Sequence, residues 1–314
     1  MKDELAKLVK EKPPEDRERL GTPVAIIGAG TNGTLMAQTI AAHGHDTLLV
    51  EVNPQLIGQV PKDLEANMDR EIRRWGMTQS EKKSILGRIA ISPSLEDARK
   101  SHFVMEAIPE SLEAKQNLFL QLDRNCPWET IFLSNTSILS LTEIASVLPE
   151  HRQERVIGLH FLNPAPRIPL VEIVRGMKTS DATFGEVKDF AESLGKTAVE
   201  VFEYPGYVTT RIILPMLNEA MHVVMEGVAT AEDIDTAMKL GFDLPMGPLA
   251  LADQIGLDEV LNSLQVLFHE LGDLKYRPCP ILKKMVRAGN LGVKTGKGFF
   301  EYETEETDST HWAL

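Results

Sequence analysis

The feature that most restricts the fold is a glycine-rich turn near the start of the chain, Gly28-Ala29-Gly30-Thr31-Asn32-Gly33. A strand-like apolar run, residues 22–27, leads directly into it, and an amphipathic helical pattern, residues 35–43, follows. In this context Gly28 permits the tight turn, Gly30 lets a pyrophosphate approach the backbone, and Gly33 lets the helix pack closely on the strand. The helix N-terminus then faces the phosphates. The segment predicts a Rossmann-type α/β domain that binds a dinucleotide.

The second predicted strand, residues 47–52, carries Glu51 near its end. A carboxylate at this distance from the glycine-rich turn is placed to accept hydrogen bonds from the adenosine ribose hydroxyls. It favours NAD over NADP, because a 2′-phosphate would meet like charge there and the following residues, Val52-Asn53-Pro54, offer no arginine to receive it. The alternative is that Glu51 is an ordinary solvated glutamate.

Three more short strand patterns, residues 89–92, 103–107 and 131–134, extend the predicted parallel sheet. Ligands of such sheets bind beyond the carboxyl ends of the strands. Glu110 and Lys115, which follow the second of these patterns, are therefore expected to line the cofactor crevice.

A serine after the third pattern is a candidate ligand contact. Ser140 and Glu143 have the spacing of a capping box for the next helix. Because Ser140 can cap that helix, Ser137 is free to contact a ligand. The alternative is that Ser137 only bonds the backbone of its own turn.

A predicted β-hairpin supplies the chemical centre. Its strands are residues 155–160 and 170–175, and three prolines lie in the turn between them. With the midpoint near Pro166, His160 and Glu172 are cross-strand neighbours, so the carboxylate can accept the proton on one imidazole nitrogen. The other nitrogen is then free to move a proton. A lone histidine in an apolar strand is more often structural, but this partner and the position at the strand end favour catalysis.

A long helical pattern over residues 55–76 has an apolar stripe on one side and a basic cluster on the other. The cluster consists of Arg70, Arg73 and Arg74, at helical spacing. It has the chemistry to receive the phosphates of a large anionic substrate. The alternative is an ordinary solvated face of a helix.

The pattern changes after the turn Tyr204-Pro205-Gly206-Tyr207, which we take as the domain boundary. Helical patterns over residues 212–228, 232–240, 249–255 and 258–271 follow the last strand pattern, 197–202. We expect a dinucleotide-binding domain over residues 1–203, with a polar arm at 1–21, and a mostly α-helical domain over 204–314. The many Met and Leu residues of the second domain indicate helix packing, including against a second subunit.

Composition excludes several classes of partner. The 314 residues carry a net charge of −13, which argues against binding to nucleic acid or to an anionic membrane surface. The two cysteines, Cys126 and Cys279, are too few for a disulfide framework or a metal cluster, and they fit a reducing cytoplasm. No apolar run is long enough to cross a bilayer. We therefore expect no metal, and a small molecule as the substrate.

Taken together, these motifs closely resemble those of the L-3-hydroxyacyl-CoA dehydrogenase family, over roughly residues 23–302. The resemblance implies an NAD-binding domain followed by a mostly helical domain that dimerises. The motifs that carry it are Gly28-x-Gly30-x-x-Gly33, Glu110, Ser134-Asn135-Thr136-Ser137, Gly158-Leu159-His160-Phe161-Leu162-Asn163-Pro164, Val171-Glu172, Pro205-Gly206-Tyr207, Pro245-Met246-Gly247-Pro248 and Lys294-Thr295-Gly296-Lys297-Gly298-Phe299.

By this resemblance, His160 is the general base, Glu172 orients it, and Ser137 bonds the substrate oxygen. Asn163 lies beside the catalytic histidine. The positions that the resemblance places around the cofactor are Glu110, Lys115, Asn135 and Lys294.

The chain departs from the family pattern at one position. The family usually has asparagine just before the arginine that follows Pro-Gly-aromatic, where it helps to hold the substrate, and Thr210 stands there instead. A threonine hydroxyl is shorter and cannot donate and accept from separate atoms as an amide does.

Two substrate classes therefore remain open for an NAD-dependent dehydrogenase. The first is a 3-hydroxyacyl-CoA, oxidised reversibly to the 3-ketoacyl-CoA, which the basic cluster favours. The second is a small hydroxy acid without CoA, such as a sugar acid or carnitine, which Thr210 motivates. A nucleotide-binding protein without catalysis is the third hypothesis, and the presence of His160, Glu172 and Ser137 argues against it.

Overall fold

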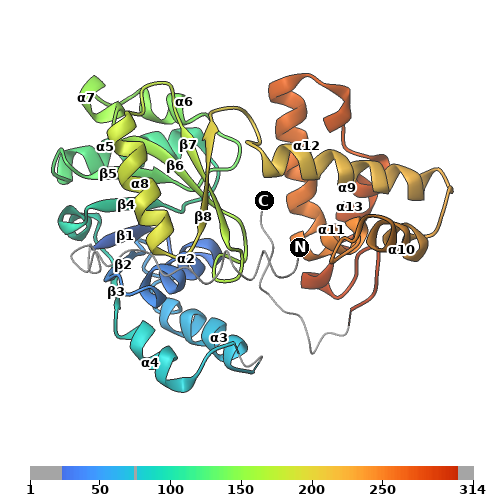
Figure 1. The fold of residues 1–314 in the computed structure, drawn as a ribbon, viewed down its shortest axis with the longest axis horizontal. Helices are drawn as coiled ribbons and strands as arrows, with labels where there is room; N and C mark the ends of the chain where they lie inside the picture. Colours follow the sequence, from blue (N-terminus) through green and yellow to red (C-terminus); the bar gives the residue numbers. More distant parts are fainter. Residues whose placement is uncertain (1–22, 74–75, 303–314) are drawn as a thin grey trace.

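The computed structural model describes residues 23–73 and 76–302. A sheet with helices on its faces, on the left of Figure 1, is followed by an all-helical part on the right. The polar arm, Arg74 and residues 303–314 lie outside the described residues. No helix in the described ranges is both long enough and apolar enough to span a membrane.

The sheet has the order β3-β2-β1-β4-β5-β6-β7-β8. Neighbours from β3 to β6 are parallel, β7 is antiparallel to β6, and β8 is parallel to β7. The predicted α/β fold is confirmed, and the strand order reverses between β1 and β4, where open sheets of this kind bind ligands. The strands are β1 (Val24–Ile27), β2 (Thr47–Val50), β3 (Ile89–Ser92), β4 (Phe103–Glu106), β5 (Ile131–Ser134), β6 (Val156–Phe161), β7 (Leu170–Arg175) and β8 (Thr197–Phe202).

Helices cover both faces of the sheet (Figure 1). One apolar core lies between the sheet and helices that include α2 and α8, and a second lies between the opposite face and helices that include α5 and α6. The helices of this part are α2 (Thr31–Ala42), α3 (Val60–Arg73), α4 (Gln79–Leu86), η1 (Leu95–Lys100), α5 (Leu112–Asn125), α6 (Leu141–Ala145), α7 (Glu150–Gln153) and α8 (Asp181–Ser193).

Several predicted helix boundaries were wrong, and two of them bear on the site. The first helix begins at Thr31 rather than at residue 35, because Gly30 is its N-cap and Gly33 lies inside its first turn. The helix predicted over residues 55–76 begins only at Val60, after a turn over residues 54–59. Pro61 lacks an N–H and is tolerated only in the first turn of a helix, which fixes this start.

The second part is built from helices around its own apolar core, which includes Leu214, Met221 and Leu264. The buried methionine and leucine side chains of this part pack into this core. Its helices are α9 (Thr209–Met225), α10 (Ala231–Phe242), α11 (Pro248–Ile255), α12 (Leu257–Leu271), η2 (Leu274–Tyr276), α13 (Pro280–Arg287) and η3 (Val293–Thr295).

The two parts join at Gly206 and Tyr207, which have φ angles of 81° and 48°. Tyr207 is buried and packs with Leu141, Val174 and Val201 of the first part. Its ring also meets the His160 ring edge-on, with the centroids 5.6 Å apart. The junction is therefore packed against the sheet next to the predicted catalytic histidine.

Candidate active site

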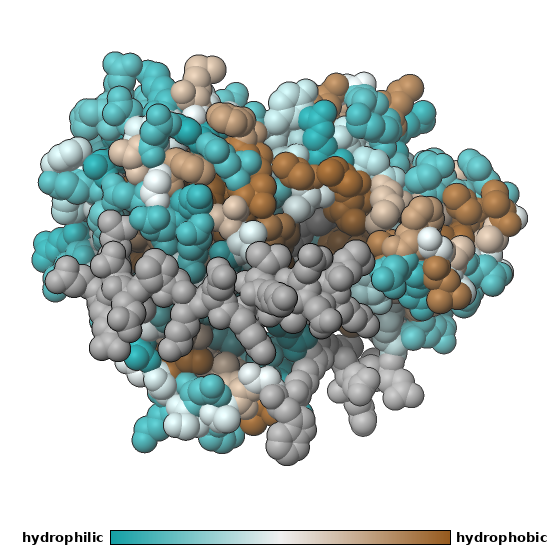
Figure 2. Space-filling view, viewed as in Figure 1, coloured by the Kyte–Doolittle hydropathy of each residue, from teal (hydrophilic) through white to brown (hydrophobic). Residues whose placement is uncertain are grey.

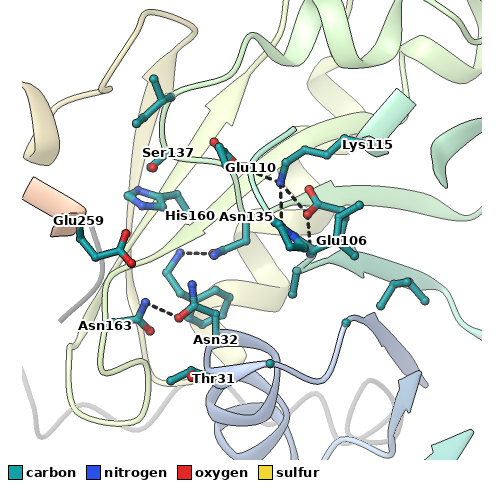
Figure 3. Close-up of a pocket in the computed structure, with 18 of the residues that line it drawn as sticks. Thr31, Asn32, Glu106, Glu110, Lys115, Asn135, Ser137, His160, Asn163 and Glu259 are labelled. Carbon is teal, nitrogen blue, oxygen red and sulfur yellow. Dashed lines mark hydrogen bonds and ion pairs between the residues drawn. The ribbon is translucent and has the colours of Figure 1, made fainter. Parts of the chain in front are cut away.

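A cleft of about 770 Å³ opens at the carboxyl ends of β1, β4, β5 and β6 and is closed on one side by α12 and η3. It brings together most of the predicted site residues, several of which are shown in Figure 3. Those that line it are Gly28, Gly30, Glu51, Glu110, Lys115, Asn135, Ser137, His160, Asn163 and Lys294.

The glycine-rich turn has the geometry that a dinucleotide requires. Gly28 has a φ of 106°, a backbone conformation that residues with a side chain rarely adopt. A Cβ on Gly33 would lie 1.9 Å from the carbonyl oxygen of Gly28, so only glycine allows this packing. A Cβ on Gly30 would meet no atom within 4 Å, so the backbone there faces open space beside the N-terminus of α2. These features fit a bound pyrophosphate.

Glu51 lines the cleft directly after β2 and holds the glycine-rich turn. Its carboxylate accepts hydrogen bonds from the backbone N–H groups of Ala29 at 3.2 Å and Asn53 at 2.9 Å. Beside it, Val52 and Leu56 line the cleft with side chains that are 56% and 53% exposed, an apolar surface suited to an adenine ring. A carboxylate here suits ribose hydroxyls and disfavours a 2′-phosphate.

A buried ion-pair network forms the wall beyond β4. The ammonium of Lys115 contacts the carboxylates of Glu106 at 2.6 Å and Glu110 at 3.0 Å. Glu106 also accepts from the hydroxyl of Ser134 at 2.6 Å. Burial raises the pKa of Glu106, whereas for Lys115 the attraction of the two carboxylates outweighs burial and raises its pKa. Lys115 is thus bound within the protein, and Glu106 is a wall residue that the sequence analysis did not select.

The predicted contact between the hairpin strands is confirmed. His160 on β6 lies opposite Glu172 on β7, and its Nδ1 is 2.7 Å from Oε2 of the carboxylate. Both side chains are buried, and His160 lines the cleft. With the proton on Nδ1 donated to Glu172, Nε2 is the imidazole nitrogen available to a ligand.

Glu172 also contacts the start of the helical part. Oε1 accepts from the backbone N–H groups of Val208 at 3.1 Å and Thr209 at 2.9 Å, and Oε2 accepts from the hydroxyl of Thr209 at 3.1 Å. Burial acts to raise the pKa of Glu172, but the hydrogen bonds and charge of His160, with those of Thr209, outweigh it and lower this pKa. The carboxylate is therefore held ionised beside the imidazole.

Two polar residues that follow β5, Asn135 and Ser137, line the cleft together with His160. Asn135 accepts from the backbone N–H of Phe161 at 2.9 Å, which leaves its amide nitrogen for the cleft. Ser137 lies next to His160 in Figure 3. Ser140 accepts from the N–H of Glu143 and so caps α6, as expected, while Ser137 lines the cleft.

Lys294 and Glu259 line the cleft from the helical part. Lys294 pairs with Asp258, 2.5 Å away. The exposed carboxylate of Glu259, on α12, faces the side of the cleft that holds His160 (Figure 3). Glu259 was not selected from the sequence, because nothing in a helical pattern shows that this face of α12 turns toward a strand end of the other domain.

Other predicted site residues lie outside the lining of the cleft. Thr210 is fully buried in the first turn of α9, and its hydroxyl has no hydrogen-bond partner among the described residues. Arg70 and Arg73 lie on α3, and Arg74 is outside the described residues. Within the described ranges, no group of His, Cys, Asp or Glu side chains is arranged to hold a metal ion.

Comparison with known proteins identifies the family of this site. Residues 23–204 match the model of the 3-hydroxyacyl-CoA dehydrogenase NAD-binding domain, and residues 206–302 match that of its C-terminal domain. A probable 3-hydroxybutyryl-CoA dehydrogenase of Bacillus subtilis is 50% identical, over 89% of this chain and 97% of the relative. The 3-hydroxybutyryl-CoA dehydrogenase of Clostridioides difficile is 43% identical, over 89% of this chain and 99% of the relative.

A solved structure agrees with the sequence comparisons. The crystal structure of (S)-3-hydroxybutyryl-CoA dehydrogenase from Ralstonia eutropha superposes with a TM-score of 0.82 and 41% identity, covering 90% of this chain and 99% of that chain. The site contains a glycine-rich dinucleotide turn and a histidine–carboxylate pair in one cleft. The chain therefore belongs to the 3-hydroxyacyl-CoA dehydrogenase family and is an NAD-dependent oxidoreductase that acts on a CH–OH group.

Proposed function

We propose that this enzyme oxidises a short 3-hydroxyacyl-CoA, of the 3-hydroxybutyryl class, reversibly to the 3-ketoacyl-CoA. The observation that carries the proposal is the contact between His160 and Glu172, which leaves Nε2 of the imidazole available in the cleft. NAD, when bound, supplies the acceptor for the hydride from C3. The short acyl group rests on the relatives named for 3-hydroxybutyryl-CoA at 43–50% identity.

Three residues have roles in the proton transfer. His160 takes the hydroxyl proton of the substrate on Nε2. Glu172, held ionised, stabilises the imidazolium that forms. Ser137 donates a hydrogen bond to the substrate oxygen and so fixes it near the base. In the direction of reduction the same imidazolium returns the proton.

The charges of the cleft favour a thioester over a free hydroxy acid. Among the described lining residues the cations are Lys115 and Lys294, and each is already paired with a carboxylate. A substrate carboxylate would meet Glu259 and Glu110 without an unpaired cation to neutralise it. A thioester is uncharged at this point. We propose that the phosphates of CoA are received by Arg70 and Arg73 on α3, outside the lining of the cleft, together with Arg74.

Asn163 and Thr210 complete the proposed substrate site. Asn163 lines the cleft, whereas the unpartnered hydroxyl of Thr210 is fully buried outside the lining, so Thr210 can meet the substrate only if the site rearranges when the substrate binds. Because the hydroxyl is shorter than an amide, we expect the substrate to be held less tightly at this position.

A substrate panel tests the proposal. NADH formation would be followed with 3-hydroxyacyl-CoAs of increasing chain length and with the corresponding free acids, sugar acids and carnitine. We expect the highest kcat/KM with the shortest CoA thioesters and little turnover of free acids. Turnover confined to free acids would reject the proposal. Turnover confined to long-chain CoA thioesters would reject the short-chain assignment.

We also propose that the protein is a cytoplasmic homodimer. The helical part exposes large apolar side chains on α9, on α10 and in the turn between them, namely Ile212, Val228, Leu240 and Phe242. Hydrophobic side chains gather over this part and over its junction with the first part in Figure 2. Cys126 and Cys279 are both buried and free, as expected in a reducing compartment. Sedimentation equilibrium tests the dimer, and a monomer at micromolar concentration would contradict it.

A further inference from the structure

The carboxylate of Glu172 receives hydrogen bonds from two domains. His160 lies on the strand opposite Glu172, whereas Thr209 begins the first helix of the second part. Both side chains donate to the same carboxylate oxygen, Oε2. This oxygen lies 2.7 Å from Nδ1 of His160 and 3.1 Å from Oγ1 of Thr209. The backbone N–H groups of Val208 and Thr209 occupy Oε1.

We propose that Thr209 is a positioning residue of the reaction, whose hydroxyl shares Oε2 of Glu172 with His160 and so limits how strongly Glu172 holds the imidazolium. The proposal builds on the role of His160 as the general base. Thr209 does not line the cleft, so it acts only through Glu172.

The direction of the effect follows from the number of donors on one oxygen. A carboxylate oxygen that accepts two hydrogen bonds carries less uncompensated charge toward each donor. Without the Thr209 hydroxyl, Oε2 attracts the imidazolium more strongly, and His160 keeps its proton to higher pH. A protonated imidazole cannot accept the substrate proton, so the hydroxyl affects the pH range over which His160 can act as the base.

The backbone donors alone do not have this effect. They donate to Oε1 and hold the carboxylate in place at the start of α9, and they remain when the Thr209 side chain is changed. Removal of the hydroxyl therefore changes the charge that His160 meets without releasing Glu172. Changes at position 209 leave the other ionisable groups around the pair of His160 and Glu172 unaltered. These groups are Glu106, Glu110 and Lys115 beyond β4, Glu203 and Tyr207 at the junction, Glu259 and Asp258 on α12, and Lys294 on η3.

The experiment is an NMR titration of the imidazole of His160 in the enzyme without ligands. Its resonances would be assigned by comparison with His160→Ala. Thr209→Val removes the hydroxyl at nearly constant shape, and we expect the titration midpoint to rise by about half a pH unit to one pH unit. Thr209→Ala should shift it in the same direction, and Thr209→Ser, which keeps the hydroxyl, should leave it at the wild-type value.

A matched control is Thr142→Val. The hydroxyl of Thr142 donates to the carboxylate of Glu203, so this variant loses a hydroxyl–carboxylate hydrogen bond whose acceptor, unlike Glu172, is not hydrogen-bonded to His160. The midpoint should not move in the control. An unchanged or lower midpoint in Thr209→Val, an equal shift in Thr209→Ser, or an equal shift in the control would overturn the proposal.

A kinetic measurement distinguishes this role from a purely structural one. In Thr209→Val the acid limb of the pH profile of kcat/KM for oxidation should move to higher pH by the same amount as the NMR midpoint. A loosened structure would lower the rate at every pH without moving the limb, and that result would also overturn the proposal. The titration needs no substrate, so it stands even if the substrate assignment fails.

Discussion

The side-chain amide of Asn163 donates a hydrogen bond to Oδ1 of Asn32 at 2.9 Å. Asn163 follows β6, two residues after the strand ends, and Asn32 lies in the first turn of α2, within the glycine-rich turn. The hairpin that carries His160 is thereby tied to the turn that faces the pyrophosphate (Figure 3). The base and the cofactor site are held in one arrangement by this contact.

Loss of the contact between Asn163 and Asn32 should weaken cofactor binding. A neutral hydrogen bond of this kind contributes about 0.5–1.5 kcal/mol, so Asn163→Ala should raise the Kd for NAD by roughly 2- to 12-fold. Asn32→Ala should have a similar effect, and the double variant should be no weaker than the single ones. Fluorescence titration with NADH measures this, and fully additive losses would show that the two side chains act separately.

Replacement of Lys115 should destabilise the fold. Lys115→Met leaves Glu106 and Glu110 without their cation, and loss of one member of a buried ion pair costs about 3–5 kcal/mol. Urea unfolding measures the change. Lys62→Met, at an exposed position of α3, is the control and should have an effect within about 0.5 kcal/mol. Adding Glu106→Gln to Lys115→Met removes the uncompensated charge and should restore part of the stability. A double variant less stable than Lys115→Met would contradict this explanation.

Glu172 should make the stability depend on pH. Its folded-state pKa is lowered from an ordinary value of 4.5, so its contribution is complete above pH 4.5 and is lost as the pH falls through the lower folded-state value. Glu172→Gln should therefore be less stable than the wild type by about 1–3 kcal/mol at neutral pH, with a smaller difference below pH 4.5. Urea unfolding at both pH values measures this. A difference that grows in acid would contradict the assigned direction.

Glu259 should influence the choice between thioester and free acid. Glu259→Lys places a cation in the cleft on the side of His160, and we expect kcat/KM for a free 3-hydroxy acid to rise about tenfold relative to the CoA thioester. Glu232→Lys makes the same charge change on an exposed position of α10 and is the control. Equal changes in the two variants would indicate a general charge effect rather than a contact in the cleft.

Local patterns were sufficient to predict the strands, the glycine-rich turn and the hairpin register. The prolines between residues 164 and 169 placed the turn, and a midpoint near Pro166 then set His160 opposite Glu172, as the strand register confirms. Contacts between distant segments could not be predicted in this way. The hydrogen bonds that Glu172 accepts from Val208 and Thr209 come from the start of a helix in the other domain. The position of Glu259 at the cleft likewise depends on how that domain packs against the first.

The pairing of charges in the cleft could not be predicted from the sequence either. Lys115 and Lys294 were predicted cofactor contacts, and only the structure shows that both are paired with carboxylates of the protein. The sequence also did not show that Thr210 is fully buried and lies outside the lining of the cleft, because the chain leads into α9 through Gly206 and Tyr207, where φ is positive at both residues.

The turnover of His160→Ala with a 3-hydroxyacyl-CoA tests most directly whether this imidazole removes the hydroxyl proton. The glycine-rich turn and Glu51 are untouched in this variant, so NAD binding should be retained. Loss of a general base typically lowers the rate by about 10²–10⁴-fold, and we predict a fall in kcat of this size. Turnover equal to that of the wild type would show that His160 is not the base and would contradict the mechanism.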